Sequence, residues 1–265
     1  MPQFRNSYTP PNVIIPPGLH LDTPVEEYDY NYVFEVDTLR SDRVELRPFT
    51  PSLHAQPLYD SLKKYPDVLK WLSISPFESL EQVVQWSEKS ARLPSDSLFY
   101  AIYTDKPGAG ENTGISKLDP DQYEFAGIIG MIASSAVHMT LEPGYILIMP
   151  PYQRTHVLTH SAGLVMHRAL DMPEQGGLGL RRCQWTTTTL NTKSQAAALR
   201  LGFKYEGVLR AQWVIPAGKE GARPGRQGVQ KADCPVRDNW WAAMTWEDWE
   251  GGVREHIDKL MSRRS

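Results

Sequence analysis

Cysteine is scarce in this sequence. The 265 residues include two cysteines, Cys183 and Cys234, and neither belongs to a CxxC pair or to a Cys/His cluster with zinc spacing. A disulfide framework and a structural zinc site are therefore not indicated, and we expect no bound metal. So few cysteines fit a reducing compartment best.

Long apolar runs and an excess of one charge are also absent. No segment approaches the ~18 uncharged apolar residues of a membrane span, and the N-terminus lacks a basic region followed by an apolar run. The 28 basic and 31 acidic residues give a net charge of -3, which provides no general attraction to nucleic acids or anionic membranes. We therefore expect a soluble, cytosolic protein whose partners include neither nucleic acid nor membrane, and which holds any bound anion by local contacts.

The composition is that of a folded chain with a distinct N-terminal segment. Hydrophobic residues make up 41% and aromatic residues 10% of the chain, enough for a sizeable core, so disorder is excluded as the main state. Residues 1–37 contain six prolines, which interrupt regular hydrogen-bonded structure. We predict a Pro-rich extension over residues 1–37 and one α/β domain over residues 38–265, because no internal repeat or linker is visible.

Hydrophobic periodicity predicts the elements of that domain. The expected strands are 43–48, 98–103, 125–132, 145–148, 183–189, 206–215 and 240–246. The expected helices are 53–65, a second that starts near 79, a third from 155 that stops before 176, a fourth from 191 to 202, and a charged C-terminal helix. Gly-rich segments at 104–123 and 216–238 are expected to be enlarged loops. The predicted order is β-α-α-β-β-β-α-β-α-β-β.

The stretch from Gly144 to Phe203 is the most informative. A short strand leads through Pro150 and Pro151 into an amphipathic helix for which Thr155 is a plausible N-cap. The unpaired N–H groups and the positive dipole end of a helix N-terminus attract phosphate. This arrangement indicates a phosphate-bearing cofactor.

Six motifs occur in order along the chain. They are Arg43-Val44-Glu45-Leu46-Arg47-Pro48, Glu142-Pro143-Gly144-Tyr145-Ile146, Pro151-Tyr152-Gln153-Arg154, Asn191-Thr192-Lys193-Ser194, Leu201-Gly202-Phe203 and Glu206-Gly207-Val208-Leu209-Arg210. Together they resemble the GNAT superfamily of acyl-CoA-dependent N-acyltransferases, most closely its RimJ/RimL-like branch, which acetylates protein N-termini and other amines. The resemblance implies a single GNAT-like α/β (α+β) domain whose mixed, mostly antiparallel central sheet is flanked by helices.

The resemblance also implies acetyl-CoA as co-substrate. Backbone N–H groups of the turn that starts at Gln153 would wrap its pyrophosphate, Arg154 would add a charged contact, and Asn191 would cap its helix and reach the pantetheine. The alternatives are that Arg154 is a solvated surface residue and Thr155 only an N-cap. The expected cofactor-binding residues are Ile148, Gln153, Arg154, Thr155, His156, Val157, Leu158 and Asn191.

The phosphate turn departs from the family pattern at two positions. His156 and Leu158 stand where small residues usually let the backbone approach the phosphates. His156 either places a ring N–H on a phosphate or simply tolerates the loop geometry. We assign His160, which stands where relatives commonly carry Glu, no role.

Amine acylation needs a neutral amine, a polarised thioester carbonyl and a proton for the leaving thiolate. In the family a backbone N–H of a splayed strand, here 145–149, polarises the carbonyl. We expect Glu142 to be the base and Ser194 the acid, with Tyr205 a weaker candidate for the acid. The alternatives without a catalytic role are that Glu142 is a solvated charge at a strand start and that Ser194 is a polar residue of the first helical turn. Cys183 is expected to be a packed small residue, so ping-pong chemistry is not indicated.

The predicted function is therefore direct transfer of an acetyl group from acetyl-CoA to a primary amine in a ternary complex. The acceptor is either a small-molecule amine or a protein N-terminus, and the protein is a monomer or a homodimer. The rival interpretation is a catalytically silent GNAT-fold module that binds CoA or a partner, and the loss of both small residues in the turn supports it.

Overall fold

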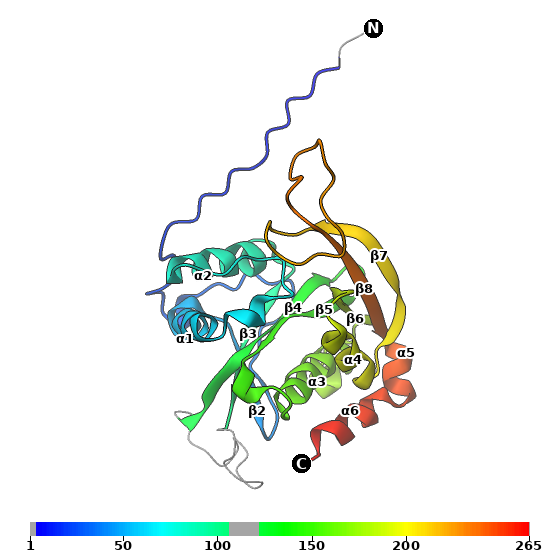
Figure 1. The fold of residues 1–265 in the computed structure, drawn as a ribbon. Coiled ribbons are helices and arrows are strands. Elements are labelled where there is room, and N and C mark those ends of the chain that lie inside the picture. Colours follow the sequence, from blue (N-terminus) through cyan, green and yellow to red (C-terminus); the bar gives the residue numbers. More distant parts are fainter. Residues whose placement is uncertain (1–3, 106–121, 265) are drawn as a thin grey trace.

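The structure is a computed structural model that describes residues 4–105 and 122–264. Within these residues eight strands form one sheet in the order β1-β2-β3-β4-β5-β6-β8-β7 (Figure 1). The strands are β1 Leu39–Arg40, β2 Val44–Pro48, β3 Leu98–Thr104, β4 Glu124–Ser135, β5 Thr140–Ile148, β6 Arg182–Thr188, β7 Lys204–Val214 and β8 Val236–Thr245. The pairing of β5 with β6 is parallel and the other neighbouring strands are antiparallel. The expected mixed, mostly antiparallel sheet is confirmed.

The helices lie on both sides of this sheet. Figure 1 shows α1 and α2 on one side and α3, α4 and α6 on the other. The α-helices are α1 Pro51–Lys64, α2 Leu80–Ser87, α3 Val157–Leu170, α4 Thr192–Arg200, α5 Trp246–Asp248 and α6 Arg254–Met261. The shorter helical turns are η1 Val25–Glu27, η2 Pro66–Leu69, η3 Glu88–Arg92, η6 Pro150–Tyr152, η7 Pro173–Gln175 and η8 Trp249–Val253. Among the described residues, none of these helices has the length and apolarity that a membrane crossing requires.

The predicted element order holds, with two differences. The strand β1 was not expected. Strand β8 begins at Val236, inside the segment 216–238 that was expected to be a loop. Of the other expected loop, 104–123, residues 106–121 lie outside the described residues. The difference at β8 arises because residues 236–238 pair with β7, a contact distant in sequence that local periodicity does not report.

The segment ahead of β1 is described from residue 4. Its first part projects away from the domain, and its later part follows the surface beside α1 and α2 (Figure 1). There the hydroxyl of Tyr30 lies 2.8 Å from Thr50 Oγ1, and that of Tyr32 lies 2.8 Å from Ser134 Oγ. The division of the chain at residue 37 stays a prediction.

Strands β5 and β6 part after a short ladder. They are paired only at Thr140 with Arg182 and at Leu141 with Cys183. Beyond this point β5 contains a bulge opposite β4, and Tyr145 adopts a φ of +46°, a conformation that is rare for an aromatic residue. We call the region beyond Leu141 and Cys183 the strand divergence. It leads directly toward the start of α3.

Packing around the bulge holds its unusual backbone. The ring of Tyr145 makes edge contacts with Trp86 and Phe99, with centroid distances of 5.4 Å and 5.0 Å. Both partners are buried in the core that α2 and β3 share. The aromatic contacts thus offset the strain of the bulge and fix the point at which β5 turns away from β6.

Candidate active site

Helix α3 begins with several unpaired backbone donors. Its N-cap is His156, so the expected N-cap, Thr155, lies one position before the actual one. Thr155 Oγ1 still accepts the Val157 N–H at 3.3 Å and donates to the Tyr152 carbonyl at 2.6 Å. In the described part of the chain, hydrogen-bond acceptors are lacking for the N–H groups of Arg154, Thr155, His156, Leu158 and Thr159.

The His156 ring is turned into the protein. Its Nε2 lies 2.9 Å from Thr104 Oγ1 and 3.7 Å from Asp105 Oδ1. Burial, together with the positive charge of Arg43, lowers the pKa of His156 to about 4. The ring is therefore neutral at physiological pH and engaged with β3, which favours the second of the two interpretations of this histidine. Its backbone N–H stays available.

The side chains of the preceding turn have different environments. Gln153 Nε2 donates to the Ile148 carbonyl at 2.8 Å, so this side chain stabilises the turn itself. Arg154 is exposed and has a φ of +63°. Arg200, the last residue of α4, donates from Nη1 to Thr159 Oγ1 at 3.1 Å and brings a positive charge to the first turn of α3. Nothing in the sequence pattern pointed to Arg200.

Glu142 is the first residue of β5 beyond the ladder with β6. Glu142 is 7% exposed, so the alternative that it is a solvated charge is wrong. Its Oε2 accepts from Gln184 Nε2 at 3.2 Å and from Thr186 Oγ1 at 3.0 Å. Burial raises the pKa of Glu142 to about 7, although these hydrogen bonds oppose the shift. The carboxyl group is thus poised to take up or release a proton near neutral pH.

Ser194 lies in the first turn of α4. Asn191 caps this helix, as expected, because its side chain accepts the Ser194 N–H at 3.2 Å. Ser194 Oγ accepts from Trp185 Nε1 at 3.0 Å. An indole nitrogen is only a donor, so this contact leaves the hydroxyl proton of Ser194 free for another acceptor.

Three consecutive residues of β6 connect these two groups. Gln184 and Thr186 bind Glu142, and Trp185 between them binds Ser194. Successive side chains of a strand point to opposite faces of the sheet. Glu142 and Ser194 are therefore held from opposite faces of β6, next to the strand divergence. The alternation along β6 was visible in the sequence, but its partners were not.

Tyr205, the weaker candidate for the acid, lies elsewhere, and Cys183 is a packed residue of β6. Tyr205 on β7 is 54% exposed and stacks on Trp240 at a centroid distance of 5.5 Å. Cys183 is completely buried, and burial raises the pKa of its thiol well above the ordinary range. A thiol in that state is a poor nucleophile, in agreement with the expected packing role.

Arg237 was missed by the sequence reasoning because it fell in the expected loop 216–238. It lies on β8 and is 7% exposed. Its Nε donates to Asn239 Oδ1 at 2.6 Å, and Nη1 donates to the Trp71 carbonyl at 3.1 Å and to Ser73 Oγ at 3.3 Å. Burial lowers the pKa of the Arg237 guanidinium to about 10, and the charges of Glu142 and Tyr145 oppose this shift.

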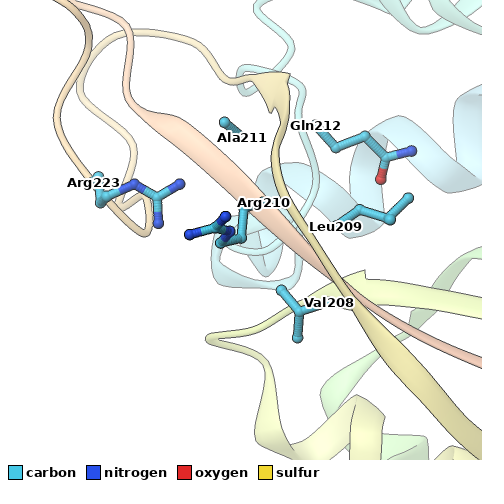
Figure 2. A pocket seen from close by; sticks show the side chains of 6 residues that line it. All are labelled: Val208, Leu209, Arg210, Ala211, Gln212 and Arg223. Carbon is cyan, nitrogen blue, oxygen red and sulfur yellow. The ribbon is translucent and has the colours of Figure 1, made fainter.

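A surface depression of about 710 Å³ lies beside β7, away from these groups. Figure 2 shows the side chains that line it, with Arg210 and Arg223 between β7 and the loop that precedes β8. Arg223 is paired with Asp238 at 2.6 Å. Neither Glu142 nor Ser194 lines the depression, so we place the candidate site at the strand divergence.

Comparisons with known proteins identify the family of this chain and proteins with a similar fold. The family model described as "Acetyltransferase (GNAT) domain" matches residues 43–204, more than half of the chain. The uncharacterised N-acetyltransferase YoaA of Bacillus subtilis is 28% identical over 172 residues, which cover 65% of this chain and 85% of YoaA. A probable GNAT-family acetyltransferase from Chromobacterium violaceum has a TM-score of 0.64 at 23% identity, with 91% of this chain and 100% of that chain covered.

Three solved structures that contain ligands share the fold at lower identity. Mycobacterium smegmatis RimJ in complex with CoA-disulfide has a TM-score of 0.56 at 16% identity, with 84% of this chain and 93% of that chain covered. The Microcin C7 self-immunity acetyltransferase MccE, in complex with acetyl-CoA and AMP, has a TM-score of 0.54 at 18% identity and coverages of 77% and 93%. Spermidine N-acetyltransferase from Vibrio cholerae, in complex with CoA and spermine, has a TM-score of 0.55 at 12% identity and coverages of 79% and 99%.

Proposed function

The chain belongs to the GNAT family of acetyltransferases, and from this premise we propose that it transfers an acetyl group from acetyl-CoA directly to a primary amine in a ternary complex. One observation carries the proposal. The buried carboxyl group of Glu142, whose pKa burial raises to about 7, and the Ser194 hydroxyl, whose proton has no acceptor among the described residues, are held from opposite faces of β6 at the strand divergence. Direct transfer requires a proton acceptor on the amine side and a proton donor on the thiol side.

The start of α3 fits the phosphates of acetyl-CoA. The expected difficulty was that His156 and Leu158 replace small residues, but the His156 ring is bonded to Thr104 and leaves the backbone N–H groups unpaired. A pyrophosphate needs hydrogen-bond donors and positive charge. The unpaired N–H groups supply the donors, and the positive end of the helix dipole and Arg200 supply the charge. We propose that residues 153–158 bind the pyrophosphate, that Ile148 lies along the pantetheine, and that Asn191 contacts it.

Each group of the site then has one task. Acetyl-CoA, when bound, supplies the activated thioester. Glu142 accepts the proton of the acceptor ammonium, so that the amine lone pair is free to attack. The backbone of the β5 bulge would polarise the thioester carbonyl, and the Ser194 hydroxyl would donate its proton to the sulfur as the C–S bond breaks. The second proton of the acceptor nitrogen, which leaves as the amide forms, would restore the Ser194 hydroxyl.

A covalent acetyl-enzyme is not part of this mechanism. Cys183 is buried on β6 with a raised pKa, so its thiol does not supply the thiolate that a ping-pong reaction needs. The amine and acetyl-CoA must therefore be bound together.

We further propose that the chain belongs to the RimJ/RimL-like branch and acts in the cytosol. The six sequence motifs support the branch, and the RimJ neighbour at 16% identity is consistent with it. The proteins in this fold neighbourhood include one named for spermidine, which supports an amine acceptor in general. The scarcity of cysteine supports the location.

Calorimetric titration with acetyl-CoA, followed by thiol-release assays with a panel of amines and N-terminal peptides, tests the proposal. We expect acetyl-CoA binding and turnover of at least one amine. Absence of both heat and thermal stabilisation at millimolar acetyl-CoA would overturn it and would favour the catalytically silent module. Rates unchanged by Ser194→Ala and Glu142→Gln would remove these two assignments and leave the transferase activity in place.

A further inference from the structure

Arg237 is a buried cation that is rigidly held. Three hydrogen bonds fix its Nε and Nη1 atoms, to Asn239, Trp71 and Ser73. The guanidinium also lies over the Trp213 ring, 4.7 Å from its centroid. Such a guanidinium loses little further rotamer freedom when it binds another group, so it is preorganised for recognition.

One end of this guanidinium is left open. Among the described residues, Nη2 has no hydrogen-bond acceptor, and Arg237 forms no ion pair with a carboxylate. Nη2 does not belong to the polar atoms that are both fully buried and unpartnered, so it keeps contact with solvent. A nine-tenths buried charge that no carboxylate contacts directly is costly. An anionic ligand at Nη2 would remove that cost.

The open end lies on the same face of the sheet as Glu142. Arg237 and Asn239 share a face of β8 because they are two residues apart, and Asn239 pairs with Thr188 of β6. Thr188 in turn shares its face with Thr186 and Gln184, the partners of the Glu142 carboxyl. This is the face opposite to Ser194, from which the acceptor amine would approach.

We propose that the acceptor is an amine that also carries a carboxylate, and that Arg237 binds this carboxylate while Glu142 receives the ammonium proton. The proposal rests on the proposed transferase function. The charges match one to one, because the acceptor ammonium faces the Glu142 carboxylate and the acceptor carboxylate faces the Arg237 guanidinium. Arg237 is then the residue that selects the acceptor.

The surrounding charges argue against other acceptors. A polyamine would place additional positive charge beside Arg237, which is unfavourable in a partly desolvated site. A dianionic phosphate would call for further cations, but the nearby Lys219 is tied to the carbonyls of Leu69 and Ile74 at 2.7 Å and 2.8 Å. Lys70 is paired with Glu220 at 3.2 Å. Of these three cations Arg237 alone is available, and one positive charge matches a carboxylate.

Matched pairs of acceptors test the proposal in the thiol-release assay with acetyl-CoA. The pairs are glycine and glycinamide, phenylalanine and phenylalaninamide, β-alanine and its amide, and 4-aminobutanoate and its amide, with spermidine as the polyamine. For at least one pair we expect kcat/KM to be about tenfold or more higher for the acid than for the amide, because the amide leaves Arg237 without its counter-ion.

Variants then assign the preference to Arg237. In Arg237→Gln the ratio of acid to amide should fall to about one, because both acceptors then meet the same neutral side chain. Arg237→Lys keeps the charge and should retain part of the preference. Arg210→Gln, which removes an exposed arginine of β7 by the same chemical change, should leave the ratio as it is in the wild type.

The outcomes separate this proposal from the proposed function. If the amides or spermidine are acetylated as well as the acids by the wild-type protein, the inference is overturned and the transferase function stands. If acetyl-CoA binds and no acid is acetylated, the inference is again overturned. If acetyl-CoA does not bind and no acceptor is acetylated, the proposed function itself fails. The comparison within the wild type does not depend on the stability of any variant.

Discussion

Replacing Glu142 by Gln should make the protein more stable at neutral pH and at the same time less active. Glu142 is 7% exposed, and burial raises the pKa of its carboxyl group from 4.5 to about 7. The folded state thus favours the protonated form. Gln has the same shape and charge as that form, and its amide oxygen can still accept from Thr186.

The magnitude follows from the two pKa values. A group whose folded pKa is above its unfolded value makes the folded state bind more protons, so stability is lost as the pH rises from about 4.5 to about 7. Each pKa unit corresponds to roughly 1.4 kcal/mol, so ionised Glu142 costs about 3 kcal/mol of folding free energy above pH 7. Glu142→Gln removes this cost. Its advantage over the wild type should grow by roughly 2 kcal/mol between pH 5 and pH 8.

Urea unfolding at pH 5, 6, 7 and 8 measures this difference, with the slope m as a check on two-state behaviour. Glu206→Gln is the matched control, because Glu206 is bonded to Arg182 at 2.5 Å and 2.8 Å and its pKa is lowered. The control should lose stability at neutral pH, which is the opposite sign. A difference between wild type and Glu142→Gln that does not change with pH would refute the raised pKa.

The same variant tests the catalytic assignment. The kcat/KM of the wild type should rise with an apparent pKa of about 7 as Glu142 ionises. In Glu142→Gln this rise should disappear and kcat should fall. A gain in stability with full activity would show that Glu142 is a buried acid without a catalytic role.

Three further predictions concern α4 and the residues around it. Asn191→Ala should lower the free energy of unfolding by roughly 1 kcal/mol through loss of the cap, and equal melting midpoints would contradict this. Gly202→Ala should destabilise by about 1 kcal/mol or more, because Gly202 has a φ of +95° and a Cβ there would lie 2.7 Å from a Val253 methyl group; unfolding by urea checks it. Trp185→Phe keeps an aromatic ring in the core and removes the hydrogen bond that orients Ser194, so it should lower kcat but not the affinity for acetyl-CoA in calorimetry. An unchanged kcat would show that this bond has no catalytic effect.

Local patterns were sufficient for most elements. The alternation of β6 and the 3.6-residue period of α3 correspond to elements with one face more buried than the other, and the apolar run of β3 to a strand that is buried almost throughout, so these local patterns report the elements directly. The end of α4 is an equally local feature. The Gly202 N–H bonds to the Leu199 carbonyl and the Phe203 N–H to the Ala198 carbonyl, the pattern of a Schellman cap that Leu-Gly-Phe indicates.

The candidate site was only partly accessible to such reasoning. Glu142 and Ser194 were identified from motifs, but their hydrogen-bond partners on β6 were not. Arg237 was missed because a strand start beside a Gly-rich loop has no local signature. The direction of the His156 ring was also open, because it depends on Thr104, which is 52 residues away in the chain.

The sequence by itself determined the family, the element order and the position of the strand-to-helix turn, because these depend on motifs and periodicities within a few residues. The tertiary structure decided the pKa of Glu142. It also decided that, among the described residues, the Ser194 hydroxyl proton and the Nη2 group of Arg237 have no hydrogen-bond acceptor. Those properties arise from burial and from hydrogen bonds between strands that are distant in the chain. Desolvation and partner geometry exist only after the sheet has brought β5, β6 and β8 together.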